Sequence, residues 1–231
     1  METNNGQYEY VLFDLDGTLT NSEGGIKRCI NYAMEKIGKS KLSDEVLNSM
    51  IGPPFVVSMK AIGLTDEETT NAIAHYRSQY AIDGWNDNVV YDGIVQMLSA
   101  LHSKGLKLSL ATSKPMRFAE KIMDYFDLSK YFVFLGAADT DNKRGSKIEV
   151  IEYVFQNLEI ADRSKVLMIG DRKYDVEGAN LAGIDCGGVL WGFGDREELT
   201  NAGAKYIFEK PSDVIKFFCC QVNNYLTALW L

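Results

Sequence analysis

The sequence has few of the residues on which several common kinds of protein depend. Its 231 residues include two histidines and four cysteines, and no Cys-x-x-Cys spacing occurs, which argues against a zinc site. Positive charge is not in excess either. The formal net charge is -8, so we expect no extended electrostatic contact with a nucleic-acid polymer or an anionic membrane. The cysteines are interpreted as free thiols in a reducing compartment.

Signals for export and long apolar runs are missing as well. The N-terminus, Met-Glu-Thr-Asn-Asn-Gly, is polar and acidic and lacks the basic start and apolar run of a secretory signal. Near the other end, Lys216 and the polar segment 221–224 interrupt the apolar residues 214–231, so we expect a packed terminal helix in place of a membrane span. The uncharged tail after Lys216 leaves a dimer contact open. We therefore expect a cytoplasmic protein, monomeric or homodimeric, with no membrane partner.

The chain does have enough apolar residues for one large core. Hydrophobic residues make up 46% of it and prolines number only four, which suits a single domain or one domain with an insertion. The pattern between about 24 and about 80 predicts helices without a strand between them, and from Tyr91 onward helices alternate with short apolar strands. We therefore predict an α/β core at residues 1–20 and 86–231 and a helical insertion at residues 21–85.

Local signals mark where several of these elements begin. Ser43 precedes one predicted helix, the capping-box pair Thr65 and Glu68 starts another, and Pro115 is expected at the first position of a third. The predicted strands of the second half span residues 107–111, 131–135, 165–169, 187–190 and 206–208.

The most informative segment is the apolar run that ends in Asp14 and Asp16. Residues two apart in a strand point to the same face, so the two carboxylates project together. They repel unless a cation or a shared proton relieves them, and no lysine or arginine occurs between positions 1 and 26. Hard cations such as Mg2+ prefer such oxygen ligands. A calcium loop is excluded, because Leu19 and Gly25 occupy the places of its glycine and glutamate, while an aspartate-rich turn is the ordinary alternative.

Other polar residues follow the predicted strands at the same edge. Thr112 and Ser113 follow one strand, Asp171 follows another with Asp175 four residues on, and Lys147 opens the helix after a third. Right-handed crossovers bring the carboxyl ends of parallel strands together, so we expect these side chains to meet. Each also has an ordinary role open to it: a helix cap for Thr112, an exposed position for Lys147, and a helix start for the two acids.

Four segments, in order, resemble the motifs of the haloacid dehalogenase-like phosphohydrolase superfamily. They are Asp14-Leu-Asp16-Gly-Thr18, Ala111-Thr112-Ser113-Lys114-Pro115, Lys147 and Gly170-Asp171-Arg-Lys-Tyr-Asp175. The resemblance covers about residues 11–217 and implies a Rossmann-like parallel sheet core with an inserted small helical cap domain. With Gly-Pro-Pro at 52–54, the whole chain is most similar to the branch of phosphoglycolate phosphatases and 5'-nucleotidases.

The resemblance implies a role for each motif residue. Asp14 would be the nucleophile that forms an aspartyl phosphate, and Asp16 the acid that protonates the leaving alcohol and later activates water. Lys147 would neutralise charge in the transition state, and Thr112 would donate a hydrogen bond to the same oxygens. The implied ligands of Mg2+ are Asp14, Asp16 through its backbone carbonyl, Asp171 and Asp175. The implied substrate-binding residues are Gly17, Thr18, Ser113 and Lys114.

Electrostatics and the second aspartate indicate which reaction to expect. Like charges at ~4 Å cost about 4 kcal/mol per pair at an effective dielectric near 20, so a phosphate dianion beside these acids needs a countercharge such as Mg2+. Family members that release halide lack Asp16, and phosphonatases have alanine there, so an alcohol leaving group is favoured. We expect a magnesium-dependent phosphatase for a small phosphorylated metabolite, either phosphoglycolate-like or a nucleoside 5'-monophosphate. A sugar phosphomutase of the same superfamily and a non-catalytic protein that binds a phosphorylated ligand stay open as alternatives.

Overall fold

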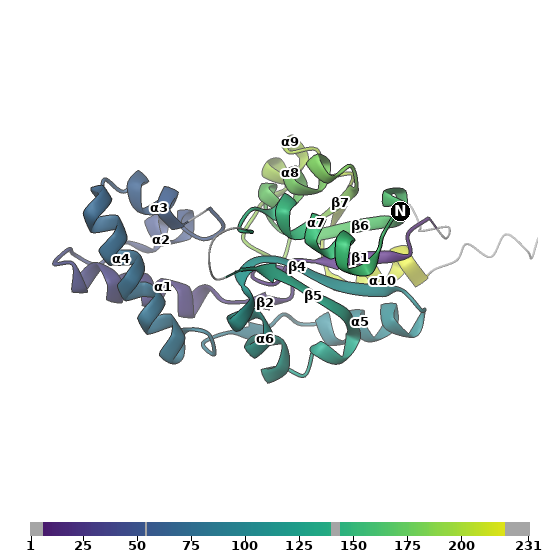
Figure 1. Ribbon diagram of the computed structural model, residues 1–231, viewed down its shortest axis with the longest axis horizontal. Helices are drawn as coiled ribbons and strands as arrows, with labels where there is room; N and C mark the ends of the chain where they lie inside the picture. Colours follow the sequence, from purple (N-terminus) through teal and green to yellow (C-terminus); the bar gives the residue numbers. More distant parts are fainter. Residues whose placement is uncertain (1–6, 54, 140–143, 220–231) are drawn as a thin grey trace, which may run out of the picture.

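Six parallel strands form the central sheet, in the spatial order β5-β4-β1-β6-β7-β8 (Figure 1). The structure is a computed structural model that describes residues 7–53, 55–139 and 144–219. The strands of the sheet are β1 (Tyr10–Phe13), β4 (Lys107–Pro115), β5 (Phe132–Ala138), β6 (Val166–Gly170), β7 (Asp185–Val189) and β8 (Tyr206–Phe208). This confirms the predicted α/β class with a parallel sheet.

Each face of the sheet is covered by its own helices. Successive side chains of a strand point to opposite faces, so Val11 and Phe13 of β1 pack in one hydrophobic cluster and Leu12 in the other. The first cluster includes residues of α5 (Ile94–Ser103), α6 (Met116–Tyr125) and α10 (Pro211–Cys219). The second includes residues of α7 (Lys147–Leu158), α8 (Lys173–Ala182) and α9 (Arg196–Asn201). The result is a three-layered core, with the first set of helices below the sheet in Figure 1 and the second above it.

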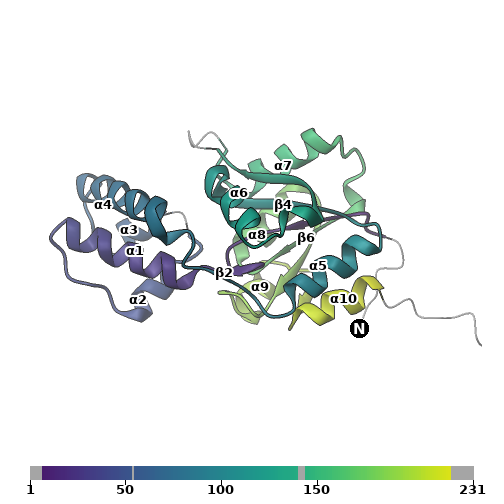
Figure 2. The same ribbon diagram turned by 90° about the horizontal axis from the view of Figure 1, so that it is seen from below.

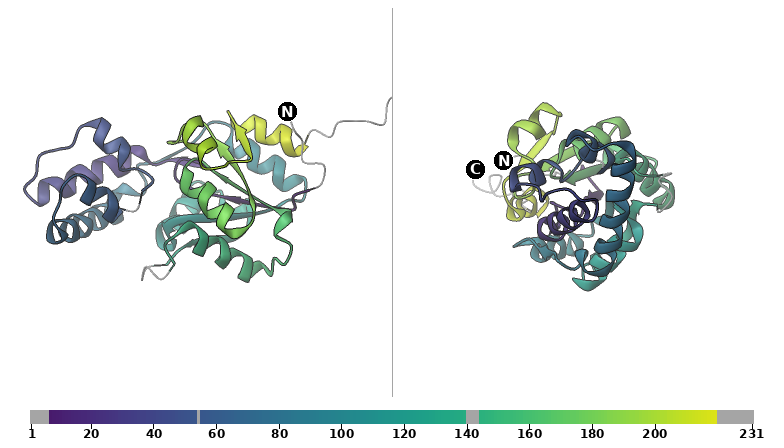
Figure 3. Two further views of the ribbon diagram at one scale, coloured as in Figure 1. Left: turned by 90° about the horizontal axis from the view of Figure 1, so that it is seen from above. Right: turned by 90° about the vertical axis from the view of Figure 1, so that its left-hand side faces the viewer.

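A separate group of helices lies beside the sheet, and we call it the helical insert (Figure 2). It contains α1 (Glu23–Lys36), α2 (Asp44–Ser49), α3 (Phe55–Ala61), α4 (Asp66–Gln79) and the π-helical turn Tyr80–Gly84. The chain enters and leaves it through the antiparallel pair β2 (Thr20–Asn21) and β3 (Val89–Val90). Figure 3 shows the insert at one end of the molecule and α10 toward the other.

The insert has its own hydrophobic cluster, which one residue of the core completes. Residues of α1 to α4 and the π-helical turn pack together there, and Phe118 of α6 joins them. The predicted capping box is present at the start of α4: Thr65 Oγ1 accepts from Glu68 N at 3.2 Å, and Thr65 N donates to Glu68 Oε2 at 2.9 Å. Ser43 caps α2 as expected. A cluster shared with Phe118 means that insert and core contact each other.

Some element boundaries differ from the sequence-based expectations. Strand β4 runs to Pro115, four residues past the predicted end, so Pro115 ends the strand and α6 begins only at Met116. The expected first helical position for Pro115 was therefore wrong: its backbone is extended, with φ -57° and ψ 134°. The chain also contains α3 and the pair β2 and β3, for which no sequence signal was identified.

The described C-terminal residues test the expected terminal helix but not the suggested dimer contact. Helix α10 packs on α5 and buries Val214, Phe217 and Phe218, as a packed terminal helix requires. Residues 220–231, where the dimer contact was suggested, lie outside the described residues. Within the described part of the chain, no helix combines the length and apolar character needed to cross a bilayer.

Candidate active site

The site forms where β1, β4 and β6 end side by side. β1 pairs with both neighbours, and Phe13, its last residue, is in register with Leu110 and Ile169. The next residue, Asp14, donates its backbone N–H to the Ile169 carbonyl at 3.0 Å, which continues the ladder by one residue. The sheet therefore holds the Asp14 backbone between the motif that ends β4 and the motif that begins at the end of β6.

Lys147 lies buried between two of the predicted acids. Its ammonium forms ion pairs with Asp14 Oδ1 at 2.9 Å and Asp175 Oδ1 at 2.8 Å, and it donates a hydrogen bond to the Ala111 carbonyl at 2.8 Å. Burial alone would lower the pKa of Lys147, but the charges of Asp14 and Asp175 outweigh it and raise that pKa above its ordinary value. Lys147 is therefore a buried positive charge that contacts the residue after β1, a carbonyl of β4 and the first turn of α8.

The capping of α7 explains how Lys147 is positioned. It is the first residue of the helix, and Ser146 before it caps the helix together with Glu149 in a capping box. On the facing helix α8, Gly178 leaves the space that the lysine stem fills, since a Cβ there would lie 2.6 Å from Lys147 Cγ. The capping-box spacing from Ser146 to Glu149 was readable in the sequence, whereas the packing role of Gly178 was not.

Asp171 is fully buried and held by two hydrogen bonds. Its Oδ1 accepts from Thr18 Oγ1 at 3.0 Å and its Oδ2 from the backbone N–H of Phe193 at 2.9 Å. Burial, followed by the charges of Asp175 and Asp14, raises its pKa well above the ordinary value. An uncompensated charge here is therefore unfavourable, although two donors are aimed at it.

The chain turns tightly around these carboxylates. Gly17 has φ +85°, a conformation that favours glycine, and a Cβ at this position would overlap Asp171 Oδ2. Thr18 beside it is fully buried. Its hydroxyl, expected to contact the substrate, donates to Asp171 in this structure. Trp191 Nε1 donates to the Thr18 carbonyl at 2.9 Å and fixes the same turn. This turn therefore orients Asp171, a contact that the sequence did not reveal.

Three carboxylates together could hold a cation. Oxygens of Asp14, Asp171 and Asp175 all lie within 4.8 Å of one another. Asp175 is buried, and burial raises its pKa to about 6 although Lys147 opposes the shift. With three acids and one lysine, the cluster carries an excess of negative charge, and its all-oxygen donor set suits a hard divalent ion. The structure thus brings together three of the four predicted metal ligands by their side chains; for Asp16 the expected ligand is the backbone carbonyl.

The second acid, Asp16, occupies a different environment from Asp14. Both of its carboxylate oxygens accept from Lys114 Nζ, at 2.7 and 2.9 Å. The Lys114 side chain is 6% exposed, whereas that of Asp16 is 23% exposed and so reaches solvent. The two aspartates of the motif therefore pair with different lysines, and the Asp16 side chain is somewhat more exposed than that of Asp14, at 23% against 15%.

Thr112 and Ser113 are separated by the direction of their side chains. Thr112 is 2% exposed, and its Oγ1 accepts from Lys114 N at 3.3 Å, which leaves the hydroxyl hydrogen free to donate. Ser113 is exposed. Neighbouring residues of a strand project to opposite sides, so Thr112 and Lys114 share a side that Ser113 does not. The structure therefore exposes Ser113 to solvent, whereas Thr112 and Lys114 are buried.

Arg172 joins the core to the helical insert, a contact that sequence reasoning missed. Its guanidinium donates from Nη1 to the Ile51 carbonyl of the insert and from Nε to Glu198 Oε1 at 2.8 Å. Gly52, with φ +107°, follows Ile51, and a Cβ on it would overlap the guanidinium. The Gly-Pro-Pro segment noted in the sequence therefore meets the core at Arg172, although Pro54 lies outside the described residues.

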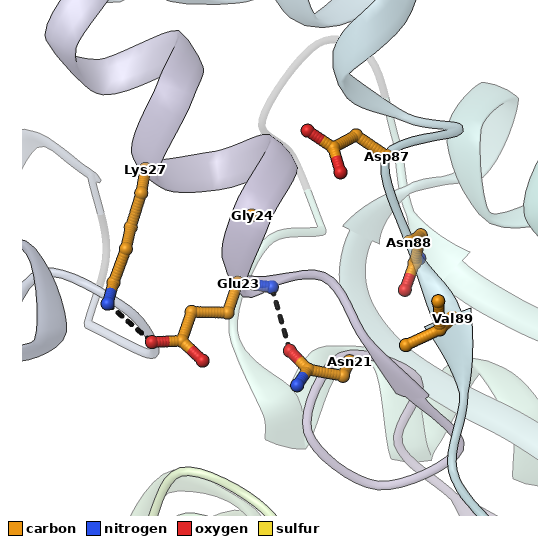
Figure 4. A pocket seen from close by; sticks show the side chains of 7 residues that line it. All are labelled: Asn21, Glu23, Gly24, Lys27, Asp87, Asn88 and Val89. Carbon is orange, nitrogen blue, oxygen red and sulfur yellow. Dashed lines mark hydrogen bonds and ion pairs between the residues drawn. The ribbon is translucent and has the colours of Figure 1, made fainter.

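A cavity of about 280 Å³ opens where the chain crosses into the helical insert (Figure 4). It is lined by Asn21, Glu23, Gly24, Lys27, Asp87, Asn88 and Val89. Asn21 Oδ1 accepts from Glu23 N at 3.0 Å, and Glu23 forms an ion pair with Lys27. The predicted site residues do not line this cavity, which belongs to the connection between insert and core.

Comparisons with known proteins agree with this arrangement. The family model described as haloacid dehalogenase-like hydrolase matches residues 11–189. The 5'-nucleotidase of Pseudomonas aeruginosa is 37% identical over 194 residues, 84% of this chain and 87% of that protein. Tyrosine-protein kinase PtkA of Mycobacterium tuberculosis is 37% identical over 186 residues, 80% of this chain but 63% of PtkA, so the chain spans less than two thirds of that relative. The crystal structure of a predicted phosphatase from Clostridium acetobutylicum is similar with a TM-score of 0.85 and 41% identity, covering 90% of this chain and 97% of that one.

Proposed function

This chain belongs to the haloacid dehalogenase-like hydrolase family, and from that membership we propose that it is a phosphatase for small phosphomonoesters. The observation that carries the proposal is the different setting of two neighbouring carboxylates. Asp14 lies beside Lys147 and two buried acids, while Asp16 lies outside that group of acids, pairs with Lys114 and is the more exposed of the two. Two carboxylates in unlike surroundings suit two roles, a nucleophile and a proton carrier.

In the first half of the reaction, Asp14 attacks the phosphorus atom of the ester. A bond forms between a carboxylate oxygen and phosphorus, and the bond from phosphorus to the alcohol oxygen breaks. Asp16 first takes up a proton from solvent, which releases its ion pair with Lys114, and then gives that proton to the oxygen as it leaves. Lys147 and the free hydroxyl hydrogen of Thr112 stabilise the charge on the phosphoryl oxygens.

In the second half, water removes the phosphoryl group from Asp14. Asp16, now a carboxylate, takes a proton from the water as its oxygen bonds to phosphorus, and the Asp14 carboxylate leaves. The enzyme returns to its starting state with inorganic phosphate as product. The larger exposed fraction of Asp16 supports this role, because the residue must meet both the alcohol and the water.

The acids also support a role for Mg2+. Asp14, Asp171 and Asp175 offer oxygens close together, and their charge exceeds that of Lys147. When bound, Mg2+ would supply the positive charge that lets a phosphate dianion approach the acids. We propose Asp14, Asp171, Asp175 and the backbone carbonyl of Asp16 as its protein ligands, and Gly17, Thr18, Ser113 and Lys114 as the residues around the substrate.

We propose that residues 21–85 act as a cap over a core formed by residues 1–20 and 86–231. The contacts of the insert with Arg172, Lys114 and Phe118 support this role, since they bring it up to the residues around the acids. Closure would exclude bulk water during the phosphoryl transfer. We further propose that the protein acts in the cytoplasm on a small phosphorylated metabolite, as a monomer or homodimer.

The test is phosphate release from a panel of phosphomonoesters with Mg2+ present. The panel contains 2-phosphoglycolate, a nucleoside 5'-monophosphate, a sugar phosphate and phosphotyrosine, the last because of the relative named a tyrosine-protein kinase. We expect release from at least one of them, and loss of that release in Asp14→Asn. Conversion of the sugar phosphate to an isomer without release would favour a mutase, and no reaction with any ester would contradict the proposal.

A further inference from the structure

Tyr80 has a buried hydroxyl that the fold does not use. The residue is 3% exposed, and its hydroxyl oxygen is enclosed without a hydrogen-bond partner among the described residues. Buried hydroxyls normally have a partner, so an unpaired one indicates a ligand or a bound water. Tyr80 also begins the π-helical turn Tyr80–Gly84, and such turns are frequent at functional sites.

The tyrosine ring lies beside Lys114, the lysine that pairs with the predicted proton carrier Asp16. The ammonium of Lys114 is 4.9 Å from the centre of the Tyr80 ring, and the same ammonium binds Asp16 through both carboxylate oxygens. Burial, and next the charge of Asp16, raise the pKa of the Tyr80 hydroxyl well above its ordinary value. The hydroxyl therefore keeps its proton and remains a hydrogen-bond donor at working pH.

Packing holds the ring in one orientation. Tyr76 stacks on it with ring centres 5.5 Å apart, and Phe118 of the core meets it edge to face at 5.0 Å. Gly84 gives it room, since a Cβ there would lie 2.7 Å from Tyr80 Cδ2. The Tyr80 ring thus packs against residues of both the insert and the core, which fixes the position of its hydroxyl before a substrate binds.

The proposed chemistry decides which part of a substrate comes near this hydroxyl. The phosphoryl group must lie at Asp14, and the ester oxygen at Asp16, which gives it a proton. The rest of the alcohol then extends on the Asp16 side, where Lys114 and Tyr80 lie. Lys114 offers an ammonium, whose charge is free for the substrate once Asp16 is protonated as the acid, and Tyr80 offers a neutral O–H, so this position then has two donors and one positive charge.

We propose that Tyr80 and Lys114 form a leaving-group subsite that selects phosphomonoesters whose alcohol carries an oxygen acceptor, best a carboxylate, next to the ester carbon. This rests on the proposed phosphatase function and adds Tyr80 as a residue that sets specificity. A substrate oxygen pairs the hydroxyl that is otherwise buried alone. A substrate whose alcohol carries an apolar group next to the ester carbon leaves the Tyr80 hydroxyl unpaired and therefore binds more weakly.

The experiment compares two esters that differ only at this place. 2-Phosphoglycolate and ethyl phosphate share the ester carbon, which carries a carboxylate in the first and a methyl group in the second. Phosphate release gives kcat/KM for both in the wild-type protein, in Tyr80→Phe and in Tyr125→Phe. Tyr125 is the control because it is 61% exposed and lies outside the subsite. Tyr80→Phe removes only a hydroxyl without a partner, and its thermal melting curve checks that it folds.

We expect the wild-type protein to prefer 2-phosphoglycolate, and Tyr80→Phe to reduce that preference about tenfold, mainly through KM. Tyr125→Phe should keep the wild-type ratio. An unchanged ratio in Tyr80→Phe overturns the inference; if both esters slow equally, Tyr80 instead positions Asp16 or Lys114. Calorimetric binding of the two esters to Asp14→Asn, with and without Tyr80→Phe, gives the same ratio without turnover. Failure of the phosphatase proposal, seen as no phosphate release by wild type, is thus separated from failure of the subsite.

Discussion

Lys147 holds together two acids that would otherwise repel each other. Moving charges into a protein interior costs several kcal/mol per ion, and only close partners offset that cost. Lys147 contacts Asp14 and Asp175 at once and is bound to the Ala111 carbonyl. These three partners hold the ammonium of Lys147 in one place, which an exposed lysine would lack. In the proposed reaction, an ammonium held in this way can stabilise the phosphoryl oxygens without first having to reorient.

Replacing Lys147 by methionine keeps the volume of the side chain and removes its charge. We expect kcat/KM for the best ester of the panel to fall about a hundredfold or more, as when one donor to a developing oxyanion is lost. Unfolding free energy should fall by about 3 kcal/mol because buried acids lose their partner, yet the protein should still fold. Steady-state kinetics and urea denaturation measure the two effects.

Lys104→Met is the matched control, since Lys104 is exposed near the end of α5. It should change neither kcat/KM nor stability appreciably. If Lys147→Met lost activity only in proportion to its unfolded fraction, Lys147 would have a structural role alone.

The excess of acids over lysine predicts that a divalent cation stabilises the fold. A ligand bound only by the native state at about a hundred times its Kd adds about 2.7 kcal/mol, and so a rise in Tm of at least ~5 °C. We expect Mg2+ to produce such a rise, measured by differential scanning fluorimetry, and EDTA to reverse it. Asp171→Asn should abolish the rise and Asp92→Asn, at an exposed position, should keep it. An equal rise in Asp171→Asn would show that the ion binds elsewhere.

At the scale of elements, the turn between α2 and α3 is the part of the insert that contacts the core's Arg172. Gly52 in this turn has a left-handed backbone and leaves room for the Arg172 guanidinium, which donates to the Ile51 carbonyl. Glu198 fixes the guanidinium from the other side. The turn can therefore dock only while residue 52 has no side chain.

Gly52→Ala should weaken that docking more than it weakens the fold. Gly63 lies in the next turn of the insert with φ +87° and open space around it, so Gly63→Ala has similar backbone strain without the overlap. Both variants should lose about 1 kcal/mol of stability. Only Gly52→Ala should also lose about tenfold in kcat/KM, the value of a hydrogen bond from a charged donor. Equal kinetics in the two variants would contradict the docking role.

The sequence predicted which residues meet at the ends of the strands, but it did not predict how far β4 extends. The apolar runs that become β1 and β6 end just before Asp14 and Asp171, and Lys147 begins helix α7. Parallel crossovers bring such positions to one edge of the sheet, so their meeting could be predicted. Strand β4 continues through Thr112 to Pro115 because β5 pairs with it that far, and pairing with a distant strand leaves no local signal.

The finer roles within the turns were not predictable for a similar reason. Thr18 donates to Asp171, which is 153 residues away along the chain, and Phe193 supplies a backbone donor with no sequence pattern at all. Tyr80 lies at the end of the predicted helical segment, and no sequence signal identified it as a site residue. Its place beside Lys114 depends on how insert and core pack, which composition and periodicity do not determine.

At the scale of the whole molecule, the proposed capping role agrees with how the insert is attached to the core. It is joined to the core through β2 and β3, two short strands after the first motif. The net charge of -8 would repel anionic substrates at a distance, so local cations such as Lys114 and Lys147 must favour the phosphate at the site itself. In the proposed mechanism, the insert therefore covers the site while the core supplies the reacting residues.

The central claim is that Asp14 is phosphorylated during turnover, and trapping that ester tests it most directly. The protein is mixed with an ester of the panel and Mg2+, quenched in the steady state and reduced with borohydride, which converts an acyl phosphate to an alcohol. Peptide mass spectrometry should then find homoserine at position 14, and none in a sample without substrate. Turnover with aspartate intact at position 14, or homoserine at position 16, 171 or 175 instead, would contradict the account.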